Sequence, residues 1–174
     1  MTMDEMLEIA CCCDPKPAEV GADAATTRVR ARVCTFTVPG APVAKGRARF
    51  AKQGGFVRAY TPAKTAAYEG LVALAAAEAM AGADPMQGPM RLGVTILLPI
   101  PASWSKRKQA LAVEGLVAAT KKPDADNVLK AIKDGMNGVV YVDDSQAVEI
   151  NVVKRYAATP KVVVVAQELE LEKA

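Results

Sequence analysis

Histidine is the most informative absence from this chain, because none of its 174 residues is one. Without an imidazole there is no Ser-His-Asp or Cys-His catalytic group, no histidine general base and no histidine-ligated zinc. Aromatic residues are also scarce, at 5% of the chain. Any chemistry must therefore rest on carboxylates, lysines, hydroxyls or thiols.

Long apolar runs are missing too, since none reaches the roughly 18 residues of a membrane-spanning helix. The first residues, MTMDEMLEIA, are acidic where a secretory signal needs positive charge. Three of the four cysteines are adjacent, at 11–13, and lack the spacing of a zinc knuckle. We expect a cytoplasmic protein with reduced thiols, no membrane partner and no small-molecule cofactor.

The composition that remains, 51% apolar and 24% charged, is typical of a globular protein. The length suits one domain, with or without a terminal extension. Residues 1–30 are acidic and alanine-rich, and Pro15 and Pro17 interrupt any helix there. We therefore expect an acidic N-terminal extension over 1–30 and a folded domain over 31–174.

Charge is distributed unevenly behind a formal net charge of +3. Residues 1–27 carry six acids and a single base, whereas residues 28–64 carry nine bases and no acid. A second basic cluster comprises Lys106, Arg107, Lys108, Lys121 and Lys122. A solvated charged face would explain such runs, but self-repulsion destabilises them and a polyanion such as DNA would relieve it.

The pattern of apolar residues and breakers predicts a mixed sheet with helices packed on it, an α/β or α+β fold. A helix is expected over 66–80, after a start at which the Thr61 hydroxyl serves as cap and Pro62 takes the first helical position. Further helices are expected over 104–113, capped by Ser103, and over 126–137. Strands are expected over 33–38, 90–98, 147–156 and 161–171, the last two as an antiparallel pair, with a hairpin joining 47–52 to 56–60.

One acidic stretch concentrates the candidate chemistry. It runs from Lys122-Pro123 through Asp124, Asp126 and Lys130, and the pair Asp143-Asp144 follows. Asp124 and Asp126 are two apart at the expected helix start, so their carboxylates can converge, and Lys130 lies four residues after Asp126 on the same helix face. If Asp143 or Asp144 joins them, three carboxylates share a pocket, and Mg²⁺ would relieve their repulsion.

Each of these residues also has an ordinary structural reading. Asp126, expected at the N-cap, could serve only as a helix cap, and Asp124 only as a turn former. The Asp143-Asp144 pair could be only a hairpin tip. Lys130 could be only an i,i+4 partner of Asp126 or Asp134.

The segments KPDADNVLKAIKDGMNG and VVYVDDSQAVEINVVKRY resemble the signature of the RusA family of Holliday-junction resolvases, which is common in bacteriophages and prophages. FTVPGAPVAKGRARF, YTPAKTAAYE and PIPASWSKRK resemble the corresponding parts of phage members, so the resemblance covers about residues 33–165. Residues 1–30 match nothing in the family. Many phage members carry a histidine before the KPD motif, and this chain has none.

The resemblance implies an Mg²⁺-dependent endodeoxyribonuclease that recognises four-way DNA junctions and nicks opposing strands. By position, the metal-binding acids of the family fall on Asp124, Asp126 and Asp144, and its catalytic lysine falls on Lys130. Asp126 thus counts as both ligand and catalytic residue. Asp134 matches a recurrent acid of uncertain role, and Asp143 fits the ligand position less well than its neighbour.

The family forms a small mixed α/β domain that dimerises, and a two-fold dimer would place one site at each cut of a junction. We expect backbone phosphates to be held by Lys45, Arg47, Arg49, Lys106, Arg107, Lys108 and Lys122. Two alternatives stay open: a non-catalytic module that binds branched DNA, and a nuclease for other branched or single-stranded DNA.

Overall fold

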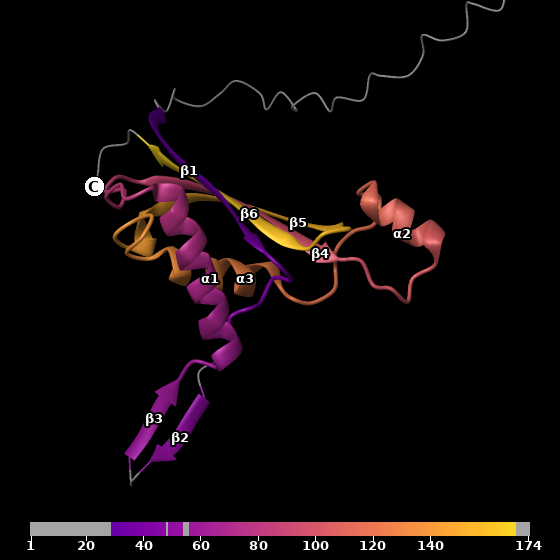
Figure 1. The fold of residues 1–174 in the computed structure, drawn as a ribbon, viewed down its shortest axis with the longest axis horizontal. Coiled ribbons are helices and arrows are strands. Elements are labelled where there is room, and N and C mark those ends of the chain that lie inside the picture. Colours follow the sequence, from indigo (N-terminus) through magenta and orange to yellow (C-terminus); the bar gives the residue numbers. More distant parts are fainter. Residues whose placement is uncertain (1–28, 48, 54–55, 170–174) are drawn as a thin grey trace, which may run out of the picture.

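The structure is a computed structural model that describes residues 29–47, 49–53 and 56–169. Most of the predicted acidic extension, including the three adjacent cysteines, lies outside these described residues. The described part forms a single mixed α/β domain, which confirms the predicted fold class (Figure 1).

A four-stranded mixed sheet forms the centre of the domain. Its strands are β1 (Val29–Pro39), β4 (Met90–Pro99), β5 (Ala147–Ala157) and β6 (Lys161–Leu169). The order across the sheet is β1-β6-β4-β5, with β6 antiparallel to both of its neighbours and β4 parallel to β5. Each strand lies within a few residues of its predicted position.

The predicted antiparallel pairing of the last two strands is wrong, because β4 lies between β5 and β6. The side chains of β4 alternate between buried and more exposed, and those from Leu92 to Leu98 on the buried side belong to the core. The connection from Ala157 to Lys161 has only to cross two strand spacings, about 10 Å, which four Cα–Cα steps span. A short loop therefore does not force its two strands to pair.

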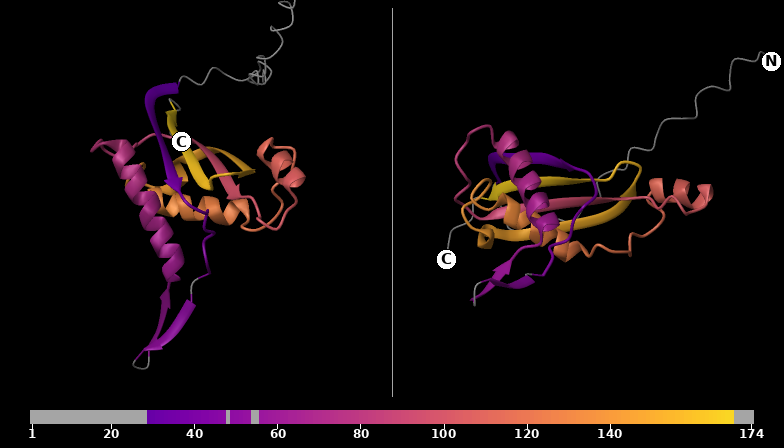
Figure 2. Two further views of the ribbon diagram at one scale, coloured as in Figure 1. Left: turned by 45° about the vertical axis from the view of Figure 1, so that its right-hand side comes forward. Right: turned by 60° about the horizontal axis from the view of Figure 1, so that its bottom comes forward.

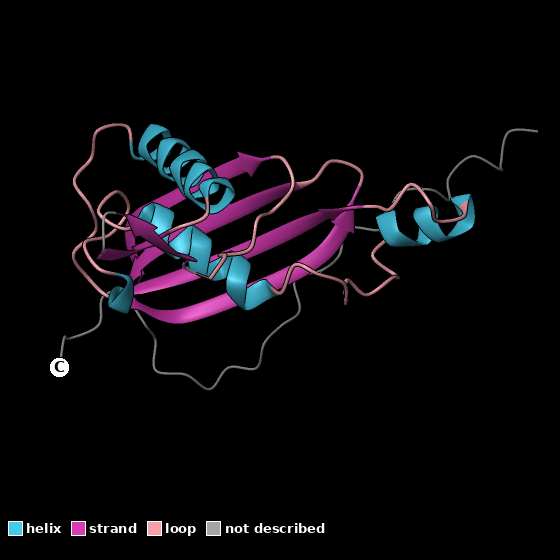
Figure 3. Ribbon diagram, turned by 90° about the horizontal axis from the view of Figure 1, so that it is seen from below, coloured by secondary structure: helices cyan, strands magenta, loops and turns pink. Residues whose placement is uncertain are grey.

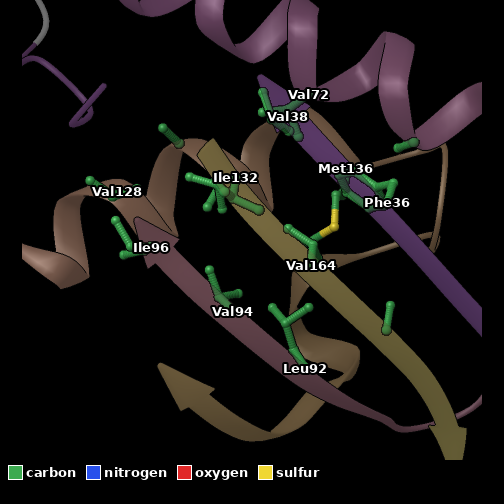
Figure 4. Close-up of a cluster of buried hydrophobic side chains, with 14 of the residues drawn as sticks. Phe36, Val38, Val72, Leu92, Val94, Ile96, Val128, Ile132, Met136 and Val164 are labelled. Atoms are coloured by element: carbon green, nitrogen blue, oxygen red, sulfur yellow. The ribbon is translucent and has the colours of Figure 1, made fainter. Parts of the chain in front are cut away.

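Two long helices, α1 (Ala63–Met80) and α3 (Ala125–Met136), lie over the same face of this sheet (Figure 3). Figure 4 shows the side chains they bury against the strands, among them Val72 from α1, Ile132 and Met136 from α3, and Val164 from β6. The two helices approach closely at Gly135, where a Cβ atom would lie 2.7 Å from the backbone oxygen of Glu69. Helix α3 is thus fixed on the core along its buried side.

Two elements project from this body at different places (Figures 1 and 2). The predicted hairpin is confirmed as β2 (Arg49–Gln53) and β3 (Phe56–Tyr60), a two-stranded sheet of its own beyond the N-terminal end of α1. The short helix α2 (Lys106–Val113) extends from the end of β4, and Ser105 rather than Ser103 accepts its capping hydrogen bond, from the backbone N–H of Lys108 at 3.4 Å.

Helix starts were predicted less well than helix positions. Pro62 occupies the N-cap of α1 and no side chain caps it, so the predicted hydroxyl cap from Thr61 is wrong. None of the helices in the described part of the chain is long and apolar enough to cross a membrane.

Candidate active site

The first two candidate carboxylates lie at the start of α3. Asp124 occupies the N-cap with extended backbone angles (φ −72°, ψ 141°), so Asp126 stands in the first turn, and its predicted N-cap position is wrong. Asp124 makes no side-chain capping hydrogen bond. Both side chains are exposed, and neither is engaged in an ion pair or side-chain hydrogen bond with any residue that the structure describes. Helix capping therefore does not account for these two acids.

Helix α3 separates its apolar and polar residues sharply. Its buried residues are Val128, Ala131, Ile132, Gly135 and Met136. Asp126 and Lys130 lie on the exposed side one turn apart, and the positive end of the helix favours the negative charge of the two aspartates. The sequence pattern predicted this arrangement correctly, because an amphipathic helix on a core can only turn its charged face outward.

Lys130 is exposed and forms no ion pair within the described part of the chain. Asp134, one of its two possible i,i+4 partners, instead pairs with Lys45. The Lys45 ammonium also lies 3.4 Å from Glu69 of α1, and its side chain is 29% exposed. Lys45 thus connects α1 and α3. This is a structural role, different from the phosphate contact predicted for it. Lys130 remains available for another partner.

The two acids of the Asp143-Asp144 pair make different contacts. Asp143 caps the single turn η1 (Asp144–Gln146), accepting a hydrogen bond from the backbone N–H of Ser145 at 2.8 Å. These bonds to Ser145 hold the pKa of Asp143 below its usual range. The carboxylate of Asp144 takes no part in this cap and lies 3.2 Å from the ammonium of Lys133 on α3. Asp143 therefore has a role in the local fold that Asp144 does not share.

Gln146 fixes the turn that carries Asp144. Its side-chain oxygen accepts hydrogen bonds from the backbone N–H groups of Val142 and Asp143, both at 2.9 Å. Its amide nitrogen donates to the carbonyls of Met86 at 3.0 Å and Gly88 at 2.9 Å. The sequence reasoning assigned no role to Gln146, although an Asp followed three residues later by Gln is the pattern of a capping box.

Tyr141 fastens the same turn to the helix, since its buried hydroxyl donates to the backbone oxygen of Lys133 at 2.7 Å. Burial, and then the nearby charges of Asp144 and Asp143, raise the pKa of this tyrosine. Neither Tyr141 nor Lys133 was singled out from the sequence. Lys133 could have been found, because it follows Asp126 and Lys130 at the i+7 position of one helical face.

Asp126 and Lys130 are exposed on one face of α3, the half-buried Lys133 follows on the same face, and Asp144 pairs with Lys133. Asp126 and Lys133 are seven residues apart, a rise of about 10 Å along the helix axis. In agreement with this spacing, no three carboxylates or thiols among the described residues are close enough to hold a metal ion. Mg²⁺ keeps several waters and needs only one or two carboxylates besides substrate phosphates. The exposed oxygens of Asp124 and Asp126 therefore suit such an ion, and Asp144 could join once it leaves Lys133.

The loop before Asp124 is held from β5. Lys154 donates hydrogen bonds to the backbone oxygens of Lys121 at 3.0 Å and Pro123 at 3.1 Å. A cleft of about 640 Å³ opens beside this loop and reaches the base of the hairpin; Gly46, Lys64, Thr65, Lys122 and Asp124 are among its lining residues. An extended polyanion strand could lie there with a carboxylate at one end and two ammonium groups along its walls.

The remaining predicted DNA contacts fall on the two projections and beside the cleft. Arg47 is exposed at the base of the hairpin and Arg49 lies in β2, while Lys122 is exposed at the cleft. Lys106, Arg107 and Lys108 are exposed in the first turn of α2. The ammonium of Lys108 lies 4.2 Å from the ring centre of Trp104, which packs edge-on against Tyr156 with ring centres 5.0 Å apart.

Comparison with known proteins agrees with this geometry. The family model of endodeoxyribonuclease RusA matches residues 39–166, which include the hairpin, α3 and η1. The chain is also 40% identical over 136 residues to "Uncharacterized protein YqaN" of Bacillus subtilis (strain 168), covering 77% of this chain and 95% of that protein. The match spans most of the chain, and the acids and lysine of the predicted motif stand where the fold leaves them exposed. The chain therefore belongs to the RusA family of endodeoxyribonucleases.

Proposed function

We propose that this protein is an Mg²⁺-dependent endodeoxyribonuclease that resolves Holliday junctions by paired nicks during DNA recombination and repair. The observation that carries the proposal is the state of Asp124 and Asp126. Both are exposed at the start of α3, and neither has a capping or ion-pair role within the described residues. Two carboxylates that make no stabilising side-chain contact in the described structure are available to bind a metal ion.

In this proposal Asp124 and Asp126 hold the metal, and Asp144 completes the set. When bound, the ion would polarise a phosphate oxygen and lower the pKa of a bound water. Lys130 lies one turn from Asp126 on the same face, where its ammonium would contact the scissile phosphate or the departing 3′ oxygen. Lys133 would keep Asp144 in place until DNA and metal arrive.

The substrate is proposed to be four-way or otherwise branched DNA, held through its backbone phosphates. The exposed basic residues of α2 and of the cleft, together with the basic sequence of the hairpin, support this partner, because phosphate contacts position a duplex without reading its sequence. A homodimer is part of the proposal: a junction has approximate two-fold symmetry and needs two cuts. The matched relative is bacterial, which supports the expected setting in a bacterial host, phage-encoded or not.

Cleavage of a synthetic four-way junction with Mg²⁺ tests the proposal. The wild type should nick two opposing strands, and Asp126→Asn should bind the junction as well but cut it at least about 100-fold more slowly, because an amide keeps the side-chain volume and loses the ligand charge. Asp84→Asn is the matched control, an exposed aspartate outside the site, and should cut at the wild-type rate.

The same assay separates the alternatives. An Asp126→Asn variant that cuts as fast as the wild type would reject the catalytic assignment. A wild type that binds junctions and never cuts them would support a non-catalytic DNA-binding module. Faster cleavage of a flap or a linear duplex than of the junction would identify a nuclease for other DNA.

A further inference from the structure

The β2–β3 hairpin stands apart from the rest of the domain. Its two strands pair only with each other, from Arg49 opposite Tyr60 to Gln53 opposite Phe56 at the tip (Figure 1). The further views in Figure 2 show the same projection beyond the end of α1. An isolated two-stranded hairpin is only marginally stable in water. We therefore expect this one to be stabilised by a binding partner.

The hairpin also exposes aromatic surface in a chain that has little of it. Phe56 is 81% exposed at the tip and Tyr60 is 46% exposed at the base, whereas aromatic residues make up 5% of the sequence. Among the described residues, Phe56 is the most exposed of the large hydrophobic side chains. A ring this open to water can still be buried by a ligand.

The positive charge of the sequence around the hairpin indicates the class of ligand. From Lys45 to Lys64 the sequence has six bases and no acid. Positive charge around an exposed aromatic ring is the combination that binds nucleic acid bases by stacking while holding the backbone. A projecting two-stranded ribbon also has the width that the DNA major groove admits. An acidic peptide would match the charge but would leave the tip ring without a flat partner.

The segment that leads into the hairpin is hydrogen-bonded to both long helices beside the candidate active site. At its base, the backbone N–H of Gly46 donates to the hydroxyl of buried Thr65 in α1 at 3.2 Å. The backbone N–H of Lys45 donates to the carbonyl of Asn127 in the first turn of α3 at 2.9 Å, one residue after Asp126. The cleft beside Asp124 begins at the same place, with Gly46 and Lys64 in its lining. DNA held by the hairpin is therefore presented to the carboxylates.

We propose that the β2–β3 hairpin is the branch-recognition arm of this enzyme. Its tip, through Phe56, stacks on base faces that a four-way junction exposes at its centre and that an intact linear duplex keeps covered. Its basic residues bind the nearby DNA backbone. The Lys45–Gly46 segment, which is hydrogen-bonded to α1 and α3, aligns a neighbouring DNA strand with the cleft. This inference rests on the proposed function and names the feature of the DNA that gives it structural selectivity.

Equilibrium binding without divalent metal tests the arm separately from catalysis. Fluorescently labelled four-way junction and linear duplex of equal length in base pairs are titrated with full-length protein in EDTA. Phe56→Ala should lower the preference for junction over duplex by about tenfold or more, the range expected for loss of one base–aromatic stack. Affinity for linear duplex should stay unchanged, because that binding depends on the phosphates.

Two further variants test whether the effect depends on an aromatic ring at position 56. Phe56→Trp keeps a stacking ring and should keep the preference, and Leu116→Ala removes a 70% exposed apolar side chain elsewhere and should also keep it. A 2-aminopurine base at the branch point should be quenched by the wild type and not by Phe56→Ala.

The outcomes separate this inference from the proposed function. A wild type that prefers the junction while Phe56→Ala keeps the same preference would overturn the branch-recognition arm and leave the nuclease proposal standing. A wild type without any preference for the junction would overturn both. Unchanged circular dichroism and thermal unfolding of Phe56→Ala show that the fold is intact.

Discussion

Helix α3 and the β2–β3 hairpin are both connected to Lys45, but they differ in how they are stabilised. Helix α3 buries five of its residues against α1 and the sheet and exposes only its charged stripe. The strands of the hairpin are hydrogen-bonded only to each other in the described part of the chain, and Phe56 at its tip is 81% exposed. Reacting groups must be held in place by a packed scaffold, whereas a binding arm can complete its packing on the ligand.

The two regions meet at Lys45. Its backbone N–H bonds to the first turn of α3, and its ammonium contacts Asp134 and Glu69. This residue connects the segment before the hairpin to both long helices. If the two proposals hold, mutations should separate cleavage from branch recognition, although Lys45 connects the two regions.

The largest effect is expected from the exposed lysine of α3. Lys130→Met keeps most of the side-chain length and removes the charge, so junction cleavage with Mg²⁺ should fall about 100-fold or more. Junction affinity should change little, because many other bases hold the phosphates. Single-turnover cleavage and a binding titration on the same junction give the two numbers. An equal loss in both would mean that Lys130 contributes to DNA binding and not to the chemical step.

Helix packing should show the next largest effect, in stability. Gly135→Ala puts a Cβ atom 2.7 Å from the backbone oxygen of Glu69 and 2.8 Å from Cβ of Val72, so it should lower the free energy of unfolding by about 2 kcal/mol. Gly70→Ala is the matched control in α1, where nothing lies within 4 Å of the new atom and the change should stabilise the helix by about 0.5–1 kcal/mol.

Urea unfolding measures both glycine variants. If Gly135→Ala is as stable as Gly70→Ala, the claim that α3 is held by close packing against α1 is contradicted. Phe56→Ala, in the hairpin, should leave the unfolding midpoint unchanged in the same experiment because its ring is not part of the core.

The smallest effect is expected at Asp143, which acts on the acid site only through the turn that it caps. Bonding to Ser145 lowers the pKa of Asp143, so the folded state binds its proton less tightly than the unfolded state. Its stabilising effect is therefore present above the ordinary Asp pKa and is lost as the pH falls through the lowered value. Asp143→Ala should reduce Tm near pH 7 by about 2 °C, with a smaller difference in acid.

Asp143→Asn provides the control for that experiment, since an amide oxygen still caps the turn but carries no charge. Calorimetric melting curves across the acidic range should show a near-normal Tm without the pH-dependent part. A Tm difference for Asp143→Ala that stays constant down to the lowest pH would contradict the assignment.

Sequence reasoning predicted the local features of this molecule best. The apolar stripe of α3, the hairpin at Gly54-Gly55 and the position of each strand follow from periodicity and turn residues. The pairing of β5 with β4 was missed because strand order depends on contacts between distant segments, which no local pattern encodes. The N-cap was misplaced because both Asp124 and Asp126 are good capping residues.

The candidate site shows the same division. The motif located the acids and Lys130, and their exposure agrees with the expected charged face of α3. The Lys133–Asp144 ion pair and the Lys45–Asp134 contact could not be predicted, because they join the helix to segments fixed only by the tertiary fold. Gln146 and Lys154 position the site through backbone carbonyls, and a sequence does not show which carbonyls are left unpaired.

The central claim is that Asp144 acts together with Asp126, although the structure shows its carboxylate paired with Lys133. Single-turnover cleavage of a four-way junction by Asp126→Asn, Asp144→Asn and the double variant tests it directly. Residues that serve one chemical step are strongly non-additive, so the double variant should cut no more slowly than the slower single variant, with junction binding preserved in all three. Wild-type cleavage by Asp144→Asn, or losses that multiply in the double variant, would contradict the account.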